Sequence, residues 1–80
     1  MTRLAGIYRA LVVDSQDPEK KQRLKVRIPD VIPGIDLWAI PCMEAGSRLL
    51  PLVGATVWVM FEQGDADRPV WLGVLPSSAR

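Results

Sequence analysis

The sequence contains no histidine and only one cysteine among its 80 residues. Histidine is the usual general base and the commonest metal ligand in proteins, so its absence removes Ser–His and Cys–His catalytic pairs and most zinc sites. Cys42 has no second cysteine with which to form an internal disulfide, which fits assembly in a reducing cytoplasm. Without a histidine to activate it, Cys42 is expected to be a small buried residue and not a nucleophile.

The sequence also lacks a long apolar run and a strong charge bias. No stretch approaches the roughly 20 apolar residues of a membrane-spanning helix. Arg9 interrupts the short apolar stretch near the N-terminus, so neither a signal peptide nor membrane insertion is expected. Ten basic and nine acidic residues give a net charge of +1, which creates no global field to attract nucleic acid or an anionic membrane.

The length predicts one domain spanning residues 1–80, with a short leader at 1–5 and a polar tail at 77–80. A composition that is 49% hydrophobic excludes intrinsic disorder. A domain of this size buries only about 60% of the surface that its unfolded chain exposes. A permanent protein partner is therefore reasonable on energetic grounds.

Apolar residues recur with period two in short segments that glycine and proline turns separate, which is typical of strands. The expected strands are 6–14, 23–29, 37–42, 56–62 and 69–75. A turn is expected at 30–36, around Pro33-Gly34, and the connection 43–52 has room for one helical turn at most. Five strands in so short a chain predict an all-β, five-stranded OB-like Greek-key barrel, with an SH3-like barrel as the second choice.

The last two expected strands form a hairpin that is apolar on both faces. Antiparallel pairing places Val57 opposite Val74, Val59 opposite Leu72 and Phe61 opposite Val70, and this face is the expected core. The other face then carries Trp58 over Gly73 and Met60 opposite Trp71. Such a sheet must be covered on both faces. Trp58, Met60 and Trp71 therefore either contact another protein, since Trp and Met are enriched at interfaces, or lie under the connection 43–52.

A series of short motifs runs in one order through residues 6–76. They are Gly6-Ile7-Tyr8-Arg9, Asp17-Pro18, Arg23-Leu24-Lys25-Val26-Arg27-Ile28-Pro29, Trp38-Ala39, Ala45-Gly46, Leu50-Pro51, Gly54, Val57-Trp58-Val59-Met60-Phe61, Gly64-Asp65, Arg68-Pro69-Val70 and Gly73-Val74-Leu75. This order resembles the N-terminal OB-fold domain of phage baseplate hub and spike proteins. That group includes the tail lysozyme-spike of T-even phages, the baseplate assembly protein V family and the Vgr-type spikes of type VI secretion.

The resemblance implies a structural, non-enzymatic component of a phage tail tip or baseplate, assembled in the host cytoplasm and located in the virion tail. In that family the OB domain is usually trimeric and joins the tail tube to the membrane-piercing device. The sequence has neither a lysozyme domain nor a β-helix needle. We therefore expect an adaptor that self-associates into a ring, with a trimer favoured, and that binds hub, tail-tube or spike proteins.

The basic residues Arg23, Lys25 and Arg27 alternate with apolar residues, so they share the outward face of their strand. We expect them, together with the loop Asp65–Arg68, at a charged rim that sets partner choice and register. The alternative function is single-stranded nucleic-acid binding, for which OB folds combine positive charge with stacking aromatics. This strand has no aromatic residue, and Asp65 and Asp67 in the last hairpin loop would repel a phosphate backbone. Nucleic acid is therefore the less favoured partner.

The acidic residues Glu62, Asp65 and Asp67 lie close together in the sequence. Calcium needs six to eight oxygen ligands, and a glycosidase carboxylate pair needs a cleft. The segment instead has the composition of a hairpin turn. We expect no catalytic, cofactor-binding or metal-binding residues and no small-molecule substrate.

Overall fold

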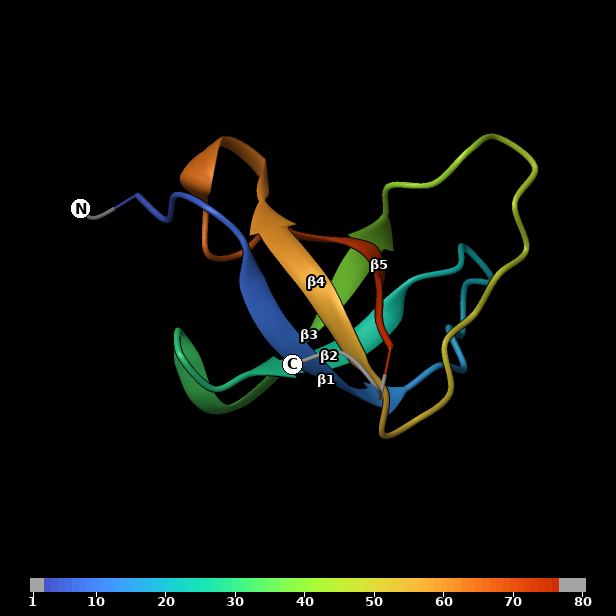
Figure 1. Cartoon of the computed structure of the whole chain (residues 1–80), viewed down its shortest axis with the longest axis horizontal. Coiled ribbons are helices and arrows are strands. Elements are labelled where there is room, and N and C mark those ends of the chain that lie inside the picture. The colour runs from blue at the N-terminus through green and yellow to red at the C-terminus, as the bar shows by residue number, and fades with distance from the viewer. Residues whose placement is uncertain (1–2, 77–80) are drawn as a thin grey trace.

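The computed structural model describes residues 3–76, which form an all-β closed barrel (Figure 1). Its elements are β1 (Tyr8–Asp14), β2 (Leu24–Ile28), β3 (Ile32–Pro41), β4 (Thr56–Phe61), a 3-10 turn η1 (Glu62–Gly64) and β5 (Pro69–Leu75). The strand order around the barrel is β1-β2-β3-β5-β4, and β1 pairs with β4 to close it. All strand pairs are antiparallel except β3 with β5. The predicted five-stranded OB-like barrel is therefore confirmed.

The first two residues of the expected leader and the polar tail 77–80 lie outside the described residues. Within residues 3–76, no helix is long and apolar enough to cross a membrane.

β2 shows most simply how the sequence determines the strands. Leu24, Val26 and Ile28 are buried in the barrel, whereas Lys25 and Arg27 between them point outward. The predicted strand is confirmed, and it is shorter by one residue at each end. The alternation works because successive side chains of a strand point to opposite faces.

The turn expected around Pro33-Gly34 is not there, and this prediction is wrong. The chain reverses at Pro29–Val31 instead, where the Val31 N–H donates to the Ile28 carbonyl oxygen at 3.1 Å. β3 already begins at Ile32. Arg27 pairs with Asp36, and the next residue of β2, Ile28, pairs with Ile32, so residues 33–35 are extra residues on β3 and form a bulge. The positive φ of +81° at Gly34 suits glycine and allows the strand to bulge without ending.

The register of the β4–β5 hairpin agrees with the prediction at one end of the hairpin and differs from it at the other. Val57 lies opposite Val74 and Trp58 opposite Gly73, as expected, but the register then shifts by one residue at a β-bulge. Beyond it the pairs are Val59 with Trp71, Met60 with Val70, and Phe61 with Pro69. Leu72 is the extra residue, next to Gly73, and an isolated glycine in a strand is a common companion of a bulge.

The bulge exchanges the two faces of β5 over Pro69–Trp71, the part of the strand that precedes it. Trp71 turns inward and is fully buried, so its predicted place on the outer face is wrong. Val70 and Leu72 are only half-buried, and Val74 is partly exposed although it keeps its predicted place opposite Val57. The prediction that these three residues lie in the core is therefore wrong as well. On β4 the predicted core residues are buried as expected. The core consists of Ala10, Val12, Leu24, Val26, Ile28, Ala39, Val57, Val59, Phe61 and Trp71.

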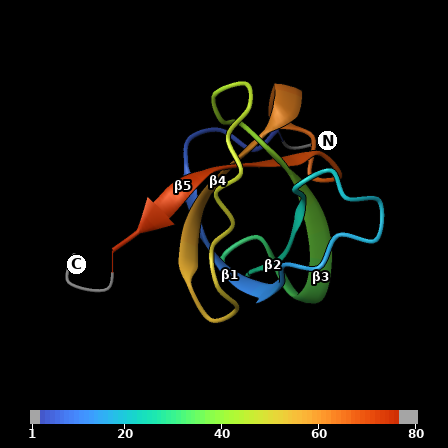
Figure 2. The same cartoon turned by 90° about the vertical axis from the view of Figure 1, so that its right-hand side faces the viewer.

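Two long loops extend from the same end of the barrel, on the right in Figure 1 and toward the viewer in Figure 2. They are the loop 15–23 between β1 and β2 and the connection 42–55 between β3 and β4. Met43 and Ala55 pack against the core and Pro51 is buried, whereas most other residues of the connection are exposed. Cys42, at its start, is exposed, so the expectation of a buried cysteine is wrong.

Candidate protein interface

A row of apolar side chains crosses the outside of the barrel. Met60 on β4 pairs with Val70 on β5, and Val70 pairs with Ile40 on β3. Met60 is 44% exposed, Ile40 is 45% exposed and Val70 is half-buried. Tyr8 of β1 pairs with Val59, so continuing that register places Ile7, which is 53% exposed, beside Met60. We call Ile7, Met60, Val70 and Ile40 the apolar row.

Trp58 lies next to this row on the same outer face of β4. It pairs with Arg9 of β1 on one side and with Gly73 of β5 on the other. The Arg9 guanidinium carbon lies 5.4 Å from the ring centroid, a cation–π geometry that fixes one side of the indole. Among the atoms of residues 3–76, a Cβ placed on Gly73 would meet no heavy atom within 4 Å. The position opposite the half-buried Trp58 is therefore open at Gly73.

Trp71 belongs to the core and not to this face. Its indole Nε1 donates to the backbone carbonyl oxygen of Gln22 at 3.2 Å. The buried ring thus both fills the barrel and holds the end of the loop 15–23. The glycine two residues later was the available sign that alternation would break in β5.

The cations of β2 form a separate surface. Lys25 pairs across the strands with Trp38, and Arg27 pairs with Asp36. β2 lies between β1 and β3 in the barrel and has no pairing with β4. The structure therefore separates Arg23, Lys25 and Arg27 from Trp58 and Met60, although the sequence suggested them as parts of one interface.

Arg27 is held by a carboxylate of its own chain. Its Nε donates to Oδ1 of Asp36 at 2.9 Å and its Nη2 donates to Oδ2 at 3.3 Å. These hydrogen bonds lower the pKa of Asp36 and raise that of Arg27, because each favours the charged form of its partner.

Arg23 is held more tightly, by Asp17 in the loop 15–23. Asp17 accepts from Nε of Arg23 at 3.0 Å and from Nη2 at 2.9 Å, and also from the backbone N–H groups of Glu19, Lys21 and Arg23. Its side chain is only 3% exposed. The hydrogen bonds from Arg23, followed by those from the backbone, hold the pKa of Asp17 well below its usual range although burial raises it.

This role of Asp17 was missed from the sequence, where Asp17-Pro18 indicated only the start of a turn. One carboxylate that accepts several hydrogen bonds from a single loop fixes the loop's shape. The remaining loop carboxylate, Glu19, pairs with Lys21 at 2.9 Å and with Arg23 at 3.3 Å. The hydrogen bond from Lys21 lowers the pKa of Glu19.

Trp38, the aromatic residue on this side of the barrel, is covered by cations. The guanidinium carbon of Arg23 lies 5.3 Å from a ring centroid of Trp38, and the Nζ of Lys25 lies 5.6 Å from one. The last cation of the loop 15–23 and the first cation of β2 thus both engage the ring.

The acidic residues of the last hairpin loop form the turn that the sequence predicted. Asp65 Oδ1 accepts from the Asp67 N–H at 2.9 Å, and the Glu62 carbonyl oxygen accepts from the Asp65 N–H at 3.0 Å. Across residues 3–76, no group of three or more His, Cys, Asp or Glu side chains is placed to hold a metal ion.

The chain was compared with known protein families. A family model described as the type VI secretion system/phage-baseplate injector OB domain matches residues 8–75. The match runs from the first residue of β1 to the last residue of β5, so it covers the whole barrel. No individual curated protein matches the chain at significant similarity.

Proposed function

Because the chain belongs to the type VI secretion system/phage-baseplate injector OB domain family, we propose that it is an adaptor that self-associates and joins a hub or tube to a separate spike. Membership of this family gives the chain a structural role in a baseplate, and for a phage it indicates the virion tail. The finer statements are proposals: a trimer, partners among hub, tail-tube and spike proteins, assembly in the host cytoplasm, and the absence of enzymatic activity.

The apolar row is the observation that carries this proposal. The barrel interior is already filled by its own core, so the row is not needed to complete the fold. Apolar side chains from neighbouring strands that share one outer face are characteristic of protein contact surfaces, and aromatic residues and Met are enriched in them. Trp58 and Met60 supply the large side chains from which interface hot spots are built.

The cations on the β2 side of the barrel, Arg23, Lys25 and Arg27, have a different role. Arg23 and Arg27 hold their own chain through Asp17 and Asp36. Lys25 has no carboxylate within ion-pairing distance among residues 3–76, so we assign it the orientation of a partner at the rim.

These contacts weigh against the alternative, single-stranded nucleic-acid binding. Cations that are already paired with carboxylates release fewer counterions on binding a phosphate backbone. The Trp38 ring, which would have to stack on a base, is engaged by Arg23 and Lys25.

The proposal is tested by the mass of the purified protein in solution, measured by light scattering over a range of protein and salt concentrations. We expect a salt-resistant oligomer that Met60→Asp converts into a monomer with an unchanged circular dichroism spectrum. Leu52→Asp is the matched control, because Leu52 is 81% exposed in the connection 42–55 and lies outside the row. A wild-type protein that is monomeric at every concentration, or equal assembly of the two variants, would contradict the proposal.

A further inference from the structure

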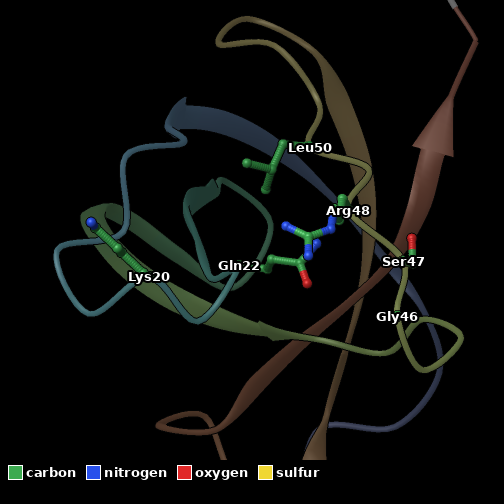
Figure 3. Close-up of a pocket in the computed structure, with 6 residues that line it drawn as sticks. All are labelled: Lys20, Gln22, Gly46, Ser47, Arg48 and Leu50. Carbon is green, nitrogen blue, oxygen red and sulfur yellow. The ribbon is translucent and has the colours of Figure 1, made fainter.

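A cleft lies between the loop 15–23 and the connection 42–55, away from the apolar row. It has a volume of about 380 Å³ and is lined by Lys20, Gln22, Gly46, Ser47, Arg48 and Leu50 (Figure 3). A second hollow of about 230 Å³ shares Lys20, Gln22 and Leu50 with it and continues toward Asp17. We call the first of these the Gln22–Arg48 cleft.

Two hydrogen-bond donors point into the same space in this cleft. Figure 3 shows the carboxamide of Gln22 and the guanidinium of Arg48 directed toward its centre, whereas the Lys20 ammonium points away at the far edge. The Gln22 Nε2 atom is buried and has no hydrogen-bond partner within the described part of the chain, residues 3–76. Buried polar groups are nearly always paired, so an unpaired one requires an explanation. Among residues 3–76, Arg48 makes no ion pair.

The position of Gln22 is fixed by the surrounding structure. Asp17 accepts from the backbone N–H groups of Lys21 and Arg23, the residues on either side of Gln22. The indole of Trp71 donates to the carbonyl oxygen of Gln22 at 3.2 Å. Together these contacts hold Gln22 at a φ of +58°, which a residue other than glycine adopts only where its surroundings impose it. A donor held in this way is preorganised for a ligand.

The donor set selects the chemistry of the ligand. A guanidinium offers parallel N–H groups that match the two oxygens of a carboxylate, and the carboxamide adds a further N–H donor. One converging cation suits a singly charged carboxylate better than a phosphate dianion. The neighbouring acid, Asp17, is already paired with Arg23, and Leu50 offers an apolar wall beside the donors.

We propose that the Gln22–Arg48 cleft binds an aspartate or glutamate side chain of a partner polypeptide. The volume exceeds that of one carboxylate and leaves room for the residues next to it. The proposal rests on the adaptor function above, and it gives the chain a second docking point, chemically distinct from the apolar row.

The test is a titration of the ¹⁵N-labelled protein followed by NMR, observing the side-chain N–H groups of Gln22 and Arg48. The probes are acetyl-Leu-Glu-Leu-amide, its neutral isostere acetyl-Leu-Gln-Leu-amide, acetyl-Leu-Leu with a free carboxyl terminus, and inorganic phosphate. We expect saturable shifts with the glutamate peptide and binding of the glutamine peptide that is weaker by about tenfold or more, because charge-assisted hydrogen bonds are lost. Tighter binding of phosphate or of the free carboxyl terminus would overturn the assignment.

Two variants locate the binding in the cleft. Arg48→Gln removes the charge, and Gln22→Glu removes both amide donors while preserving the shape of the side chain. Each should weaken binding of the glutamate peptide by about tenfold or more. Arg68→Gln is the control, because Arg68 is another exposed arginine and lies in the loop between β4 and β5. Equal binding by Arg48→Gln and the control would overturn the proposal.

The two proposals fail in different ways. If the glutamate peptide does not bind while Met60→Asp still dissociates the oligomer, only the cleft assignment is overturned. If the peptide binds while the protein is monomeric, the cleft assignment stands and self-association is overturned.

Discussion

The strands β2 and β4 both flank β1, and both fill the core with alternate residues, yet their outer faces differ in kind. β2 presents Lys25 and Arg27, whereas β4 presents Trp58 and Met60. The arginines on the β2 side have carboxylate partners within the chain, but Met60 is left exposed in a row of other apolar side chains. A line of cations in a sequence thus does not by itself indicate a partner, because the chain can supply the counterions.

The largest expected effect tests the inner side of the hairpin against its outer side. Trp71→Ala removes the largest buried side chain and should lower the free energy of unfolding by about 3–5 kcal/mol, a large part of the stability of a small domain. Trp58→Ala, on the half-buried outer position, should cost about 1 kcal/mol or less. Urea denaturation followed by circular dichroism measures both. Equal losses would mean that the two tryptophans do not differ in burial.

A smaller effect distinguishes the two ion pairs on the β2 side. Asp17 and Asp36 both have a lowered pKa in the folded state, so their contribution to stability is present above the unfolded pKa of about 4 and is lost as the pH falls below it. Asp17→Asn should reduce the pH dependence of the free energy of unfolding more than Asp36→Asn does, because the side chain of Asp17 is nearly buried and accepts more hydrogen bonds. The measurement is the urea midpoint of unfolding at several pH values between 7 and 2. Equal slopes of the midpoint against pH in the two variants would contradict the larger contribution assigned to Asp17.

The smallest expected effect concerns Arg27. Its pair with Asp36 is partly exposed, and exposed ion pairs contribute little to stability. Arg27→Gln should lower the melting temperature only slightly and leave the oligomer mass unchanged, in contrast to Met60→Asp. Loss of assembly in Arg27→Gln would show instead that the β2 face is part of the interface.

The recurrence of apolar residues at every second position was enough to predict β2 and β4, because each strand has one buried face along its whole length. It was not enough for β5, where a bulge at Leu72 allows Trp71 to enter the core. The apolar pattern of β5 is compatible both with the predicted register and with the observed, bulged one. Which of the two forms depends on how the barrel interior is filled. The turn at Pro29–Val31 was missed because Pro33-Gly34 gives the stronger local signal, although there the glycine supports a bulge.

The candidate site shows the same limit. The outward positions of Trp58 and Met60 were predicted correctly, because large apolar residues at alternate positions of β4 are visible in the sequence. The bonds of Asp17 and the Gln22–Arg48 cleft were not, since they depend on how a loop folds and on two segments that only the closed barrel brings together.

The hydrogen bond from Trp71 to Gln22 also provides a spectroscopic signal. Each of the three tryptophans contributes one indole N–H resonance, and that of Trp71 is buried and hydrogen-bonded. Its hydrogen should exchange with deuterium only when the barrel opens, so its exchange rate reports the stability of the core. Its chemical shift depends on the carbonyl group of Gln22. A partner that moves the loop should therefore shift a core resonance without contacting any tryptophan.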